Sequence, residues 1–131
     1  MVLTCGDTFL IPKSSDDTEH LWIVITPPEA DTARAVCVNV TTKQSYSETT
    51  VILRPADHPF IQHESVIFYK DAQILDLNRV EQALNAGIMN LVCKPHAPCS
   101  EELLKRIQAG MLQSKQLKKE VKEELFWIPA F

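Results

Sequence analysis

The sequence has no excess of basic residues. Lysine and arginine number 13 against 17 aspartates and glutamates, which gives a net charge of -4. A general nucleic-acid-binding protein would usually show the opposite balance. The charge therefore argues against that class, although a small local basic groove is compatible with it.

Long apolar runs are also missing. No run reaches the roughly 18 residues that a membrane span needs. The first residues, MVLTCGDTFLIP, lack a basic segment followed by a long apolar stretch, so we expect no signal peptide. These features predict a cytoplasmic protein that has no membrane partner.

The four cysteines are then expected to be reduced thiols, because the cytoplasm is a reducing compartment. We predict that Cys5 and Cys37 are buried, unpaired strand residues that act as small hydrophobic side chains. Cys93 and Cys99 have polar, proline-rich neighbours and are predicted to react more readily.

An apolar fraction of 45% over 131 residues is enough for the core of one domain, residues 1–131. Short apolar segments separated by polar turns predict a small, curled antiparallel sheet or barrel over about residues 6–75. The predicted strands are Thr8–Ile11, Leu21–Thr26, Ala35–Val40, Thr49–Leu53, Ser65–Tyr69 and Ala72–Leu75.

Two of these segments also predict which faces are buried. The run Leu21–Thr26 is apolar throughout, which is typical of a strand covered on both faces. In Ala35–Val40 the valines alternate with Ala35, Cys37 and Asn39, so the valines share one face.

The remainder, about residues 76–131, is predicted to be helical. Asp76 or Asn78 can cap a short helix over 79–86. Ser100 is a good N-cap for a longer helix over 100–124. Its apolar face would carry Leu103, Ile107 and Met111, and Gly110 would be a weak point.

Residues 56–75 concentrate the side chains that carry chemistry. The segment contains two of the four histidines, on a loop that leads into the apolar run SVIFY. Reactive side chains on a loop that is fixed by a strand commonly form a site. The alternative is that Asp57 closes a turn and that His58 and His63 are ordinary half-buried imidazoles.

Two groups of residues have the composition of a metal site. One is His58 and His63 with Asp57, which could supply three ligands to zinc. The other is Cys93, His96 and Cys99. Structural zinc normally needs four ligands, and Pro95 and Pro98 favour an extended lead-in to the last helix, so we expect neither a metal nor a cofactor.

Four segments, in this order, resemble the PemK/MazF-like toxins. GDTFLIP at residues 6–12 is similar to their opening strand, and HLWIVIT at 20–26 to their second. AVCVNVTTKQ at 35–44 is similar to their third strand, and ESVIFYKDAQILDLNRV at 64–80 to a later segment. The resemblance implies an SH3-like barrel of five to seven strands with helices at its edge.

The same resemblance implies an endoribonuclease that is neutralised by an antitoxin protein. In those toxins an Arg-Pro step and a strand-three hydroxyl residue serve RNA cleavage, and these positions fall at His20, Leu21 and Thr41. The arginine and the proline are therefore both replaced. The alternative is a non-enzymatic module on the same barrel that recognises a protein or peptide.

RNA cleavage through the 2′-hydroxyl needs a base, an acid and positive charge near the phosphate. Histidines exchange protons near neutral pH and suit the first two roles. The candidate catalytic residues, which we predict to converge on one face, are His20, Thr41, His58, His63 and Ser65. The candidate RNA-binding cations are Lys43, Arg54 and Lys70.

The end of the sequence carries an apolar seam and three aromatic residues. Leu117, Val121 and Leu125 recur at helical spacing between charged residues. A helix with so narrow a seam needs a surface to lie on. Of the two surfaces, its own sheet or a second chain, we favour a homodimer interface formed by Phe126, Trp127 and Phe131.

Overall fold

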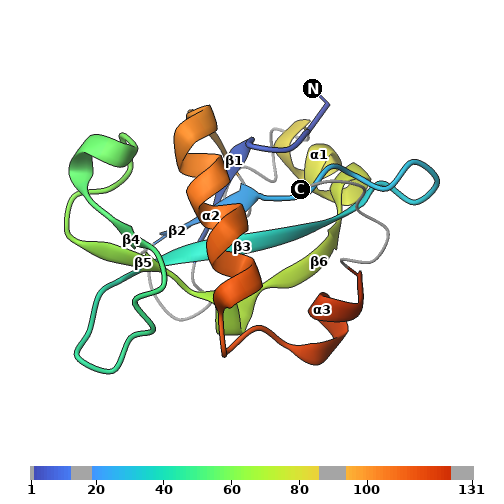
Figure 1. Ribbon diagram of the computed structural model, residues 1–131. Coiled ribbons are helices and arrows are strands. Elements are labelled where there is room, and N and C mark those ends of the chain that lie inside the picture. The colour runs from blue at the N-terminus through green and yellow to red at the C-terminus, as the bar shows by residue number, and fades with distance from the viewer. Residues whose placement is uncertain (1, 13–18, 86–93, 125–131) are drawn as a thin grey trace.

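A computed structural model describes residues 2–12, 19–85 and 94–124 (Figure 1). Within these ranges the chain is mixed α/β, with an antiparallel sheet of seven strands and the last two helices after it. The strands are β1 (Thr8–Pro12), β2 (Glu19–Val24), β3 (Arg34–Thr42), β4 (Ile52–Leu53), β5 (Ser65–Ile67), β6 (Gln73–Asp76) and β7 (Lys94–His96). The helices are α1 (Leu77–Asn85), α2 (Glu101–Gln113) and α3 (Lys119–Glu124), with 3₁₀ turns η1 (Pro55–Asp57) and η2 (Tyr69–Asp71).

Strand β3 is the centre of the sheet. It pairs with β2 along one edge, and its other edge is shared by β6 and β5, one after the other. Cys37, for example, pairs with Val24 of β2 on one side and Gln73 of β6 on the other. The order across the sheet is β4-β5-β3-β2-β1-β7.

The sheet is not closed into a barrel, so the prediction of an SH3-like barrel is wrong in this respect. Among the described residues no pairing joins the outer strands β4 and β7. Closure requires the two outer strands to pair along their length. β4 has 2 residues and β7 has 3, too few to form that seam.

Both faces of the sheet are covered instead. Leu21 and Ile23 of β2 belong to the core that α2 covers. Trp22 and Val24 point the other way, into a second core with Leu77 of α1. The prediction of a strand buried on both faces is confirmed. The alternation in β3 is confirmed as well, because its valines lie in the first core and Ala35 and Cys37 in the second.

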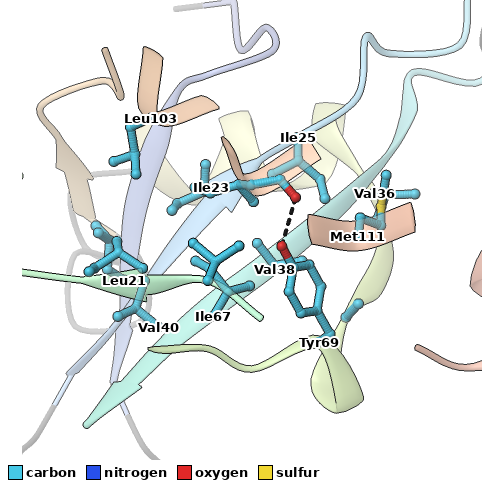
Figure 2. Packing of buried hydrophobic residues seen from close by; sticks show 14 of the residues in the cluster. Leu21, Ile23, Ile25, Val36, Val38, Val40, Ile67, Tyr69, Leu103 and Met111 are labelled. Carbon is cyan, nitrogen blue, oxygen red and sulfur yellow. Dashed lines mark hydrogen bonds between the residues drawn. The ribbon is translucent and has the colours of Figure 1, made fainter. Parts of the chain in front are cut away.

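Helix α2 lies across the first face (Figures 1 and 2). Ser100 caps it, because its hydroxyl accepts a hydrogen bond from the Leu103 amide at 3.1 Å, as the sequence predicted. Figure 2 shows Leu103 above Leu21 and Met111 beside Val36. Figure 2 also shows the Tyr69 hydroxyl directed at the helix, where it donates to the Ile107 carbonyl at 2.7 Å.

Gly110 lies in close contact with Val51 and with Tyr69 of η2. A Cβ at this position would lie 2.5 Å from the Tyr69 hydroxyl oxygen and in collision with Val51. Only a residue without a side chain lets the helix lie so close.

The predicted helix over 100–124 is interrupted, because α2 ends at Gln113 and α3 begins at Lys119. Glu48 binds the chain between the two helices. One of its carboxylate oxygens accepts a hydrogen bond from the Ser114 hydroxyl at 2.6 Å, and the other accepts one from the Lys115 amide at 3.0 Å. After this break Leu117 and Val121 turn into the core under α2. This part of the seam therefore packs on the protein's own core, and Leu125 lies outside the described residues.

Other boundaries differ from the prediction for local reasons. The Asp76 carboxylate accepts from the Asn78 amide at 2.9 Å, so α1 begins at Leu77 instead of 79. The predicted strand Thr49–Leu53 shortens to two residues. The predicted strand Ser65–Tyr69 ends at Ile67, and the chain then turns through η2. Strand β7 was not predicted.

Candidate functional site

One pocket of about 520 Å³ brings together most of the predicted catalytic residues. It lies where β2, the end of β3, the loop before β5 and β7 meet. Four of the five predicted residues line it: His20, Thr41, His63 and Ser65. The other lining residues are Glu19, Val40, Thr42, Pro59, Phe60, Ile61, Gln62 and His96.

The His20 ring is positioned by a contact with β3. This residue lies near the start of β2, and its Nδ1 is 3.3 Å from the carbonyl oxygen of Val40 on β3. A carbonyl oxygen only accepts, so Nδ1 carries the proton and donates. In the neutral ring Nε2 then carries the lone pair and is a hydrogen-bond acceptor.

His96 reaches the pocket because β7 pairs with β1. Its Nδ1 accepts a hydrogen bond from the Ala97 amide at 2.8 Å, which places the proton of the neutral ring on Nε2. The ring lies edge to face with Phe60, with centroids 5.8 Å apart. His20 and His96 therefore offer opposite hydrogen-bonding characters at Nε2, one an acceptor and the other a donor.

His63 is exposed on the loop before β5, and its ring makes no hydrogen bond to any residue within the described ranges. Ser65 fixes the loop at this point, since its hydroxyl donates to the His63 carbonyl at 2.8 Å. Ser65 is only 6% exposed. The structure thus gives Ser65 a role in positioning the His63 backbone, and the His63 ring is free to meet a ligand.

His58 does not join the other four residues. It is 3% exposed, and both ring nitrogens are used by the protein. Nε2 donates to the Ala97 carbonyl at 2.6 Å and Nδ1 accepts from the Phe60 amide at 3.1 Å. Burial lowers the pKa of His58, and the neighbouring His96 lowers it further, against the raising effect of the Ala97 carbonyl. The side chain therefore ties the loop to the segment after β7.

Asp57 serves the same loop. Its carboxylate accepts from the Arg54 amide at 2.8 Å and from the Arg106 guanidinium of α2 at 2.9 Å. Burial by itself would raise the pKa of Asp57, but these two hydrogen bonds outweigh it and the pKa is lowered. Arg106 also donates to the Ile52 carbonyl at 2.8 Å, so the helix holds both ends of this turn.

The predicted RNA-binding cations lie outside the first pocket. Lys43 and Arg54 both contact the Glu64 carboxylate, at 3.2 and 3.5 Å, on an exposed surface beside the pocket. Lys70 lines a second pocket of about 380 Å³. Thr41 and Thr42 line both pockets, so the two hollows are neighbours.

No group of three histidine, cysteine or carboxylate side chains is placed to hold a metal ion within the described residues. The predicted cysteine behaviour holds for Cys37, which is buried in β3 and has a raised pKa because of that burial. Cys5 is half-buried and lies in a turn before β1, so the prediction of a buried strand residue is wrong for it. Burial raises the pKa of Cys99 to about 12, so this thiol is less reactive than its neighbours in sequence suggested. Cys93 lies outside the described residues.

The comparison of the chain with protein-family models found no match, and neither did its comparison with curated proteins. No helix in the described ranges is long and apolar enough to cross a membrane.

The sequence interpretation missed His96 as a pocket residue. His96 lies in β7, a strand of 3 residues that contains a proline. So short a strand has almost no alternation of polar and apolar residues by which it could have been predicted. Glu19 was missed because it precedes an apolar run and looked like the end of a loop.

Proposed function

We propose that this protein is a metal-independent endoribonuclease that cleaves RNA by acid–base chemistry in the first pocket. The observation that carries the proposal is the presence of His20, His63 and His96 around one hollow with the hydroxyl of Thr41. The order of the segments that resemble the PemK/MazF-like toxins supports the same activity. On that resemblance we also propose an antitoxin partner that blocks the pocket.

The tautomers suggest how the roles divide. His20, whose Nε2 is unprotonated, takes the proton from the 2′-hydroxyl as its oxygen attacks phosphorus. The bond from phosphorus to the 5′-oxygen breaks, and protonated His63 gives a proton to that oxygen. The products are a 2′,3′-cyclic phosphate and a free 5′-hydroxyl. His96 donates from Nε2 to a phosphate oxygen and stabilises its charge.

The missing arginine of the toxins is compatible with this arrangement. Hydrogen-bond donors can stabilise phosphate charge when they are fixed in place. His96 and Thr41 are such donors. Lys43 and Arg54 share the Glu64 carboxylate, so this group adds one net positive charge beside the pocket. In this proposal the imidazole of His96 takes over the charge stabilisation that the arginine gives in the toxins.

Cleavage of a fluorescently labelled single-stranded RNA tests the proposal. We expect His20→Ala and His63→Ala each to reduce the cleavage rate by about 10²–10⁴-fold, the range for one acid–base group. Wild-type activity should follow a bell-shaped pH profile and survive a chelator. Gln82→Ala, at an exposed position of α1, is the control and should match wild type.

The RNA itself provides a second control. Replacement of each 2′-hydroxyl by a 2′-O-methyl group removes the attacking oxygen and should abolish cleavage. A wild-type protein that cuts no RNA, or variants as active as wild type, would refute the proposal and favour a binding module.

A further inference from the structure

The second pocket is the basis of this inference. It lies beside the first, shares Thr41 and Thr42 with it, and has a volume of about 380 Å³. Its other lining residues include Tyr46, Glu48, Phe68 and Lys70. Two of these, Tyr46 and Phe68, are among the few large hydrophobic side chains that the described residues leave exposed.

Tyr46 lies in a turn that is closed by two hydrogen bonds. The Gln44 amide donates to the Ser47 hydroxyl at 2.9 Å, and the Ser47 amide donates to the Gln44 carbonyl at 3.1 Å. This turn leaves Tyr46 at its tip with 83% of its surface exposed. Phe68 follows β5 directly, is 37% exposed, and has its backbone fixed by a hydrogen bond to the Asn39 carbonyl at 2.9 Å.

The charge of this pocket favours an anionic ligand. Lys70 is exposed and makes no ion pair with any residue that the structure describes. The acidic lining residue, Glu48, already uses both carboxylate oxygens on Ser114 and Lys115. The pocket thus combines two aromatic rings with a positive charge that no acidic side chain neutralises directly.

We propose that this second pocket binds the unpaired base next to the cleaved bond of a single-stranded RNA. Tyr46 and Phe68 would stack on the base, and Lys70 would contact the adjoining phosphate. Aromatic rings stack on any exposed base, and cations follow the backbone, which is how proteins hold single strands. The inference rests on the proposed function, because the strand that enters the second pocket is the strand cut in the first.

Binding, measured without cleavage, tests the inference independently of catalysis. The probe is a fluorescein-labelled 2′-O-methyl RNA of about ten nucleotides, a length that spans a typical single-strand site, and the measurement is fluorescence anisotropy at low salt. We expect Tyr46→Ala and Phe68→Ala each to weaken binding by about tenfold. Tyr46→Phe and Phe68→Tyr, which keep a ring, should bind within about twofold of wild type.

Two further measurements sharpen the test. Lys70→Ala should lower the slope of log K against log salt by about 0.7, the value for one phosphate contact on a single strand. A duplex of the same sequence should bind more weakly, because pairing hides the faces of its bases. Circular dichroism of every variant should match wild type, because the altered side chains are exposed.

The outcomes separate this inference from the proposed function. Loss of binding in Tyr46→Ala and Phe68→Ala supports the second pocket even if no RNA is cut. Binding that survives both substitutions, equal binding of the duplex, or no binding by wild type would overturn it. If binding survives both substitutions, or if the duplex binds equally well, RNA cleavage that depends on His20 and His63 could still be observed.

Discussion

The four histidines show how residues of one type acquire different roles. His58 and His63 are five positions apart on one loop, yet His58 has both nitrogens hydrogen-bonded and is buried, and His63 is exposed at the pocket. Nothing in their sequence neighbours separates them. The difference comes from Ala97, which is far along the chain and whose carbonyl accepts from His58 and from Thr8.

A pH dependence of stability follows from His58. In the unfolded chain this ring binds a proton near pH 6.5, whereas its lowered pKa means that the native protein binds it only at lower pH. Protons therefore favour unfolding, and stability is full above about pH 6.5 and falls as the pH decreases toward the native pKa. Urea unfolding midpoints measured at a series of pH values should show this loss.

His58→Gln is the variant that tests the assignment, because the amide can still donate to the Ala97 carbonyl but does not titrate. We expect it to lose part of the acid-side slope. His63→Gln is the matched control and should keep the wild-type slope. If both variants titrate like wild type, another group is responsible for the pH dependence.

At the scale of elements, the seating of α2 on the sheet decides the shape of the site. Arg106 on this helix fixes the turn at Asp57, and Tyr69 from η2 donates to the middle of the helix. Gly110 has no side chain and therefore allows α2 to lie close to Tyr69 and Val51. The loop that carries His63 is therefore positioned by a helix that contributes no residue to the pocket.

Gly110→Ala is predicted to destabilise the protein. Alanine would improve helix propensity by about 1 kcal/mol, but its methyl group would collide with Val51 and Tyr69, and overpacking of this kind costs about 1–3 kcal/mol or more. Urea unfolding gives the net value. Gln113→Ala, at an exposed position of the same helix, should change stability by less than about 0.5 kcal/mol.

A double variant identifies the contact. If the collision with Val51 is the cause, Gly110→Ala combined with Val51→Ala should cost less than the sum of the two single changes. Strict additivity, or a stabilised Gly110→Ala protein, would show that the helix shifts freely away from the sheet.

At the scale of the whole molecule, the break between α2 and α3 decides what the end of the chain does. Leu117 and Val121 are buried in the core, so this part of the apolar seam needs no second chain. Phe126, Trp127 and Phe131 lie outside the described residues, and the homodimer through them remains our proposal.

Two changes distinguish the contribution of Leu117 to stability from the contribution of the three aromatic residues to dimerisation. Leu117→Ala should destabilise the monomer by about 2–5 kcal/mol, the usual cost of deleting a buried leucine side chain, whereas Lys119→Ala at an exposed position should not. Truncation after Glu124 keeps the described fold and removes the three aromatic residues. Sedimentation should then show a monomer in place of a dimer; a wild-type monomer, or a truncated dimer, would reject the interface.

The sequence by itself determined the elements whose patterns are local. The alternation in β3, the continuous apolar run of β2 and the Ser100 cap depend on residues within a few positions of one another, so their prediction succeeded. The positions His20 and Thr41 came from the resemblance to the toxins, and His63 and Ser65 from the concentration of reactive side chains around the loop before β5; all four line one pocket.

Only the tertiary structure decided the rest. The pairing of β7 with β1 brings His96 to the pocket, and the short outer strands leave the sheet open. Glu48 interrupts the last helix from more than 60 positions away, and the Ala97 carbonyl removes His58 from the site. Each of these contacts joins distant parts of the chain. Their free energy depends on distances that exist only after folding, and no periodicity in the sequence records them.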